Sequence, residues 1–156
     1  MKNKYFPEEE ISRDDLYFIC YMIERVARKL HQKNCYVVNS IGREDLYHLL
    51  SVANVLHCEN PLQVEEEWTR EYHLEKGNVD VTKVDEDLGV NIPSAIQMGK
   101  VYVRLIQNTA ARDEDYVDGI LRIYNDSICD IIDNYNSSAY YEPSYVIARA
   151  YLAGGF

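Results

Sequence analysis

Apolar residues that recur every three or four positions constrain the fold of this chain more than any other feature. The clearest run is Leu16, Ile19, Cys20, Ile23, Val26, Ala27 and Leu30. This spacing places the side chains on one face of an α-helix. Ser12 precedes the run, and Asp15 lies three residues after Ser12. This pair has the pattern of a capping box at a helix N-terminus. We therefore predict a helix that begins after Ser12 and ends near Leu30.

Similar runs predict further helices along the chain. Their expected ranges are 44–57, 61–77, 96–110, 113–135 and 143–152. Residues 36–38 could form a short strand or a helical turn, and residues 79–84 could form an extended segment. Residues 78–94 are the most irregular part and the one place where a subdomain break is plausible. Together, the predicted helices favour an all-α fold. We expect a single-domain bundle of five to six helices over residues 1–156, with at most one minor β segment.

The charge is strongly acidic, with 26 Asp and Glu against 16 Lys and Arg and a net charge of -10. Nucleic-acid binding and binding to anionic membranes both depend on Lys and Arg, so we expect neither. An acidic surface instead suits fast, salt-sensitive association with a basic protein. The alternative is that the charge only keeps the protein soluble.

Tyrosine is the unusual residue in the composition, with fourteen tyrosines against three phenylalanines and one tryptophan. Its apolar ring and polar tip suit half-buried positions and protein interfaces. The alternative is that the rings cap a small core. A homo-oligomer formed through a tyrosine-rich face is a further expectation.

No pattern of residues indicates a catalytic or metal site. The four cysteines are Cys20, Cys35, Cys58 and Cys129, and no two of them have the spacing of a zinc or redox motif. The chain contains no HExxH motif and no glycine-rich phosphate loop, so we expect no metal and no cofactor. Unpaired cysteines and a polar N-terminus indicate the reducing cytoplasm and no membrane segment. The adjacent pair His57 and Cys58 is retained as the place where an unrecognised enzyme site would lie.

The residues predicted to bind a partner are aromatic anchors and acidic side chains. The anchors are Trp68, Tyr72, Tyr140 and Tyr141, and the acidic residues are Glu65, Glu66, Asp126, Asp130 and Asp133. The three aspartates follow each other at i, i+4 and i+7, which places them on one polar face of the expected helix 113–135. Such a face is either simply solvated or the place where a basic partner docks.

About a third of the chain, residues 16–68, resembles the small helical DUF3791-like proteins. The residues that carry the resemblance are the opening helix from Tyr17 to Glu24, then Gly42, Leu46, Val55-Leu56-His57 and Val64-Glu65-Glu66. The resemblance implies a partner role, because these proteins are similar to the smaller member of two-gene cassettes. The other member of such a cassette resembles an ADP-ribosyltransferase. Residues 69–156 lie outside the resemblance.

Three functions follow as hypotheses. The first is a non-enzymatic binding protein of antitoxin or immunity type, which neutralises a basic partner, for example an ADP-ribosyltransferase-like protein. The second is an acidic mimic of nucleic acid that inhibits a nucleic-acid-processing enzyme, and it requires carboxylates on one continuous surface. The third is a small enzyme with its site near His57 and Cys58, and it requires a concave pocket that contains both side chains.

Overall fold

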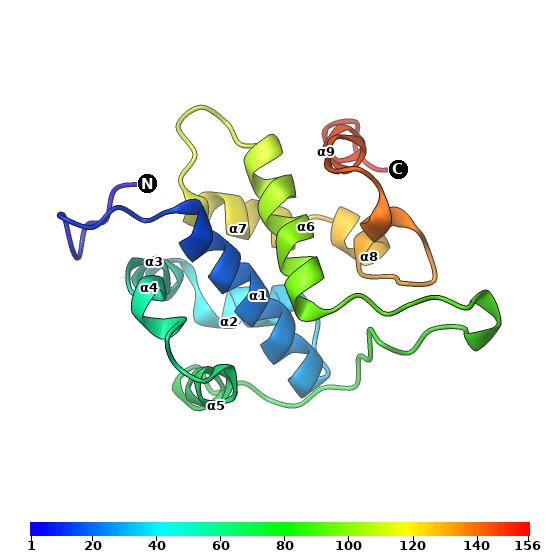
Figure 1. Ribbon diagram of the computed structural model, residues 1–156, viewed down its shortest axis with the longest axis horizontal. Coiled ribbons are helices and arrows are strands. Elements are labelled where there is room, and N and C mark those ends of the chain that lie inside the picture. Colours follow the sequence, from blue (N-terminus) through cyan, green and yellow to red (C-terminus); the bar gives the residue numbers. More distant parts are fainter.

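The computed structural model describes all of residues 1–156 and is built entirely from helices and loops (Figure 1). The α-helices are α1 Arg13–Leu30, α2 Asn34–Ile41, α3 Arg43–Ser51, α4 Ala53–Leu56, α5 Pro61–Glu71, α6 Ala95–Asn108, α7 Tyr116–Tyr124, α8 Ile128–Ile132 and α9 Ser144–Leu152. Two 3₁₀ turns, η1 Glu86–Leu88 and η2 Ala139–Tyr141, lie in the connections. The all-α class is therefore confirmed. The expected minor β segment is absent, because residues 36–38 lie inside α2 and residues 79–84 form a loop.

Side-chain caps place the starts of the main helices where the sequence predicts them. Ser12 and Asp15 form a capping box that starts α1. The Asn60 side chain accepts a hydrogen bond from the Leu62 amide at 3.0 Å and starts α5. Ser94 is the N-cap of α6, which begins at Ala95, one position before the expected start at residue 96. These caps satisfy amide groups that have no partner inside the helix.

The number of helices exceeds the prediction of five to six because two expected helices are each broken in two. Residues 44–57 form α3 and α4, which are separated at Val52. Residues 113–135 form α7 and α8, with a turn at residues 125–127 between them. Helix α7 begins at Tyr116, after its N-cap Asp115, which is three residues later than the expected start at residue 113. Helix α5 ends at Glu71, six residues before the expected end at residue 77.

Helices α1 and α6 pack side by side at the centre of the molecule (Figure 1). Gly99 permits this close approach, because a Cβ atom at that position would lie 3.2 Å from the Tyr21 backbone. Helices α3, α4 and α5 lie on one side of α1, and α8 and α9 lie beyond α6. A single core of 33 buried residues joins both halves of the chain, and it includes Trp68, Leu74 and Met98.

The long connection between α5 and α6 extends away from the central helices and returns at Pro93 (Figure 1). Its first part is fixed to the end of α1, since the Gly77 amide donates to the Leu30 carbonyl at 2.7 Å. The Asp85 amide donates to the Asn136 side chain at 2.7 Å, which ties the middle of the connection to the residues after α8.

No helix of the protein is both long and apolar enough to cross a membrane.

Candidate functional site

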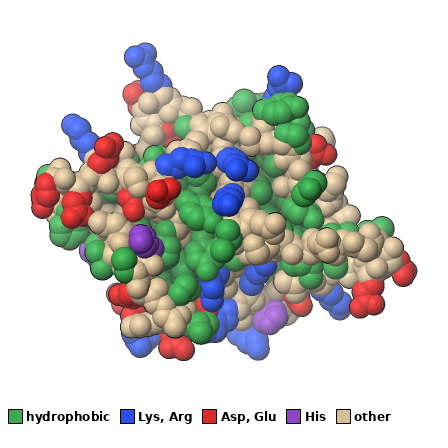
Figure 2. All heavy atoms as spheres, in the orientation of Figure 1, with side chains coloured by type: hydrophobic (Ala, Val, Ile, Leu, Met, Phe, Trp, Pro, Cys, Tyr) green, Lys and Arg blue, Asp and Glu red, His purple; other side chains and the backbone are tan.

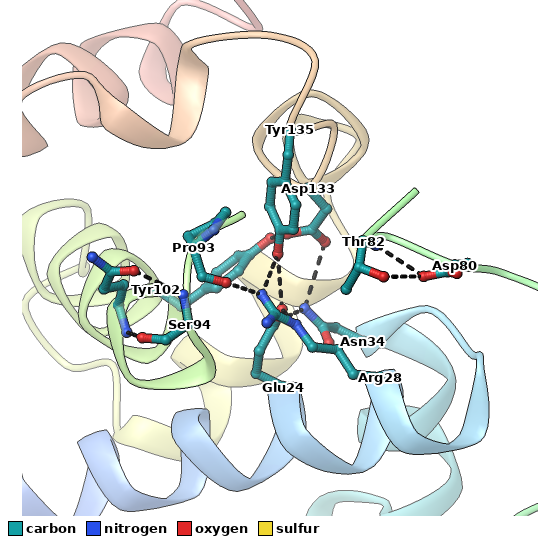
Figure 3. Close-up of polar contacts among 11 residues, drawn as sticks. Glu24, Arg28, Asn34, Asp80, Thr82, Pro93, Ser94, Tyr102, Asp133 and Tyr135 are labelled. Carbon is teal, nitrogen blue, oxygen red and sulfur yellow. Dashed lines mark hydrogen bonds and ion pairs between the residues drawn. The ribbon is translucent and has the colours of Figure 1, made fainter. Parts of the chain in front are cut away.

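The largest of the main cavities, about 630 Å³, lies between the C-terminal half of α1, the start of α2, residues 79–83 and the α7–α8 connection. We call it the α1–α8 cavity. Its volume falls within the range of small-ligand sites in proteins, about 300–1,000 Å³. Figure 3 shows the polar side chains that meet beside it, which come from α1, α2, α6 and the residues after α8. This convergence from distant parts of the chain makes it the leading candidate site.

Glu24 of α1 is the most enclosed carboxylate in the cavity, with only 2% of its surface exposed. Its Oε1 accepts from Arg28 Nε at 3.0 Å and from the Tyr135 hydroxyl at 2.9 Å. Its Oε2 accepts from Asn34 Nδ2 at 2.8 Å. A buried charge is tolerated when it is paired and hydrogen-bonded, and both conditions are met here.

Arg28 connects Glu24 to the segment that leads into α6. Its Nη2 donates to the Pro93 carbonyl at 2.7 Å and to the Tyr135 hydroxyl at 2.9 Å. The guanidinium carbon also lies 5.5 Å from the centre of the Tyr135 ring, within the range of a cation–π contact. The cavity therefore already holds one guanidinium group against a carboxylate, a carbonyl and an aromatic ring.

Asp133 is the second carboxylate of the cavity, and it has no ion-pair partner. Its Oδ1 accepts from the Tyr102 hydroxyl at 2.6 Å, and its Oδ2 lies 3.5 Å from Asn34 Nδ2. Burial, followed by the negative charge of Glu24, raises the pKa of Asp133 well above its usual value. A carboxyl group of this kind beside a cavity is typical of functional sites.

Two tyrosines beside the site, Tyr102 and Tyr124, have stacked rings. The rings of Tyr102 and Tyr124 lie 4.6 Å apart between centroids, and both side chains are almost fully buried. Tyr124 also lines the cavity, and its buried hydroxyl has no hydrogen-bond partner. This hydroxyl faces the thiol of Cys20, which is fully buried in the core.

The rim of the cavity is more acidic than basic. Five carboxylates line the cavity, against three cationic side chains, Arg28, Lys33 and Lys83. Two of the cations are already paired, Arg28 with Glu24 and Lys33 with Asp130 at 3.2 Å. Asp126 is half-buried and accepts from the Ile128 amide at 2.9 Å. The cavity therefore has unneutralised negative charge.

The three aspartates predicted as a surface stripe do come together, although not on one helix. Asp126 lies in the turn between α7 and α8, Asp130 on α8 and Asp133 at its C-terminal end. All three line the α1–α8 cavity. The helix break turns the expected solvated stripe into one wall of a concave site.

Two of the predicted partner residues on α5 are not at the surface. Glu65 is 3% exposed and forms ion pairs with Arg25 and Lys29, the second at 3.3 Å. Trp68 is 2% exposed and belongs to the core. Both lie on the face of α5 that packs against α1, so in this fold neither is an anchor or a steering charge for a partner.

The other two predicted residues of this segment lie away from the α1–α8 cavity. Glu66 is exposed on the outer face of α5, beside Arg70. Tyr72 follows the last residue of α5 and is half-buried, and burial raises its pKa to about 12. The acidic patch expected at residues 65–66 is thus reduced to one exposed carboxylate.

Tyr140 and Tyr141 line a second cavity of about 400 Å³ between α6 and α9. Tyr141 is 84% exposed, whereas Tyr140 is half-buried and donates to the Asn91 carbonyl at 3.1 Å. The Tyr140 ring packs edge-on against Tyr135, with 5.3 Å between centroids. Tyr135 lines the first cavity and Tyr140 the second, so this contact links one residue of each cavity.

His57 and Cys58 do not line any of the main cavities. Both are exposed, and the Cys58 sulfur lies 3.8 Å from His57 Nδ1. No group of three or more His, Cys, Asp or Glu side chains is arranged to hold a metal ion.

Sequence reasoning missed Glu24, Asn34 and Tyr102. One signal was present, because Glu24 occupies the apolar face of α1 with Arg28 four residues later. A charged residue on a buried face requires a partner, and the i,i+4 position supplies it. Asn34 and Tyr102 gave no comparable signal.

The chain was compared with protein-family models, with curated proteins and with solved structures, and none of these comparisons found a match.

Proposed function

We propose that this protein is a non-enzymatic binding protein that recognises and neutralises a basic partner protein, in the manner of an antitoxin or an immunity protein. The observation that carries the proposal is the meeting of Asp126, Asp130 and Asp133 at one cavity with excess negative charge. The exposed Tyr141 nearby adds the kind of aromatic side chain that anchors protein interfaces. An ADP-ribosyltransferase-like protein is the partner that the resemblance of residues 16–68 suggests.

The nucleic-acid mimic is the weaker alternative because it needs a continuous row of carboxylates. On the face shown in Figure 2, acidic side chains lie mainly at the edges and are mixed with basic ones. At the centre of this face, over α1 and α6, hydrophobic side chains lie next to a group of basic ones. Several other carboxylates, such as Glu44 and Asp118, are neutralised by ion pairs.

The test is an affinity capture from the native host with a variant that removes charge only at the cavity. Asp126→Asn and Asp130→Asn are combined, since asparagine keeps the oxygen that accepts from the Ile128 amide. The control combines Asp87→Asn and Asp113→Asn, two exposed aspartates away from the cavity that change the net charge equally.

We expect the native chain and the control to bind the same basic protein, and the cavity variant to bind it about tenfold more weakly at low salt. Mass spectrometry identifies the partner, and a nucleic-acid-processing enzyme would favour the mimic. Equal binding by the cavity variant and the control, or the absence of any basic partner, would contradict the proposal.

A further inference from the structure

We infer that the α1–α8 cavity receives an arginine side chain of the partner, whose guanidinium pairs with Asp133. This inference rests on the proposed function and adds the chemical identity of the group that is recognised. It assigns to Asp133 the part of a specific acceptor, beyond a general contribution of negative charge.

The charges of the cavity favour a cation as the occupant. Glu24 is fully satisfied by Arg28, Asn34 and Tyr135, and Arg28 is used in that pair. An anionic ligand would therefore meet no free guanidinium, and it would find one unpaired cation, Lys83, against five carboxylates. Asp133, in contrast, is a carboxylate that only neutral groups hold in place, Tyr102 at 2.6 Å and Asn34 at 3.5 Å.

The neighbouring groups favour a guanidinium over an ammonium group. Arginine presents a planar fork of donors that matches carboxylates and stacks on aromatic rings, whereas lysine is a compact and strongly hydrated charge. Arg28 already makes such contacts in this cavity, with a carboxylate, a backbone carbonyl and the ring of Tyr135. One guanidinium group, that of Arg28, is therefore already bound in this cavity.

The cavity has room for an arginine side chain, because its volume is about 630 Å³ and Asp133 lies on its lining without an ion-pair partner. The raised pKa of Asp133 is consistent with a site that lacks its cation in the free protein.

The direct test uses capped tripeptides as probes of the intact protein. Gly–Arg–Gly is compared with Gly–Lys–Gly and with Gly–citrulline–Gly, which has the shape of arginine without its charge. Binding is followed by the NMR signals of the Asn34 side-chain amide and of the backbone around Asp133. We expect the arginine peptide to bind about tenfold more tightly than the citrulline peptide, and Gly–Lys–Gly to bind less tightly than Gly–Arg–Gly.

Two variants locate the effect. Asp133→Asn keeps an oxygen for the Tyr102 hydroxyl and should weaken the arginine peptide about tenfold, whereas Asp113→Asn should leave it within about twofold. Equal binding of arginine and citrulline peptides, or of the native chain and Asp133→Asn, would overturn the inference.

The same variant separates this inference from the proposed function. If a basic partner is captured in a way that depends on Asp126 and Asp130 but not on Asp133, the partner role stands and the arginine site is wrong. If no basic partner exists but the arginine peptide still binds through Asp133, the arginine specificity stands and the partner role is wrong.

Discussion

At the scale of the residue, the two central carboxylates of the cavity illustrate how the surroundings decide what a charge does. Glu24 is the more buried of the two, yet Arg28 and two neutral donors compensate its charge. Asp133 has neutral donors alone and faces the charge of Glu24. The charge of the first carboxylate is therefore compensated within the fold, whereas the second has no ion-pair partner.

Asp133 gives a prediction about stability as a function of pH. Its folded-state pKa is raised, so the folded protein resists ionisation of this group more than the unfolded chain does. Stability from this residue is then full below about pH 4, the unfolded pKa, and is lost as the pH rises towards the folded pKa. The loss is at most about 1.4 kcal/mol per pH unit.

Asp133→Asn removes this loss, so the variant should match the native protein at pH 4 and become progressively more stable than it as the pH rises. Urea unfolding at several pH values measures the difference. The groups that also face Asp133 are Glu24, Arg28, Tyr102 and Asp130, and they are common to both proteins. A variant that is less stable than the native chain at neutral pH would refute the prediction.

Glu65 and Glu66 provide a matched pair of adjacent glutamates. Glu65→Gln leaves the cations of Arg25 and Lys29 without their buried partner, and we expect a loss of about 2 kcal/mol in the free energy of unfolding. Glu66→Gln changes an exposed side chain and should have an effect within about 0.5 kcal/mol. Urea unfolding measures both variants, and similar values for the two would show that the buried ion pairs contribute nothing.

At the scale of the element, the starts of helices were predictable and the breaks were not. Ser12 and Asn60 precede apolar runs and cap α1 and α5 as their types suggest. The break between α7 and α8 falls within an apolar run of unchanged spacing. The helix breaks because two side chains at this point form hydrogen bonds that compete with those of a helix. The Asn125 side chain exchanges two hydrogen bonds with the Asn39 side chain, at 2.8 and 3.0 Å, and the Asp126 carboxylate accepts from the Ile128 amide.

Gly119 in α7 gives a prediction about how closely α7 packs on α6. A Cβ atom at this position would lie 2.6 Å from Cγ2 of Ile106, which is buried in the core. Gly119→Ala should therefore lower the free energy of unfolding by about 1 kcal/mol, although alanine favours the helix by a similar amount.

A double-mutant cycle tests the cause of this loss. Ile106→Ala removes the clashing methyl group and is itself destabilising, but in that background Gly119→Ala should cost nothing or should stabilise the protein. Additive losses in the cycle would place the effect of Gly119→Ala elsewhere.

At the scale of the whole molecule, the all-α class follows from the sequence because helical spacing repeats along most of the chain. The cavity does not follow, since it joins residues 24–35, 79–83 and 124–135, and only the packing of the helices brings these segments together. Asp130 could be identified as one member of an acidic stripe. Its position in the same cavity as Glu24 depends on the break before α8, which the spacing of apolar residues does not reveal.

The four cysteines report on opening of the molecule as a whole. Cys58 is exposed, whereas Cys20 is fully buried and its pKa is raised to about 12 by burial. In a thiol-labelling experiment, Cys58 should react at once. Cys20 should react more than about a thousandfold more slowly, because its reaction must wait for an opening that costs at least about 5 kcal/mol.

The labelling rate of Cys129 shows whether the α1–α8 cavity opens separately from the core. It is buried in α8, its thiol lies 3.0 Å from the Ile123 carbonyl, and it also lines the α1–α8 cavity. Labelling of a Cys58→Ser variant at the same rate for Cys129 and Cys20 would mean that α8 opens only with the whole fold, which is the outcome that a single continuous core predicts. Faster labelling of Cys129 would show that the wall carrying Asp130 and Asp133 moves independently, so that a partner would bind a mobile cavity rather than a preformed one.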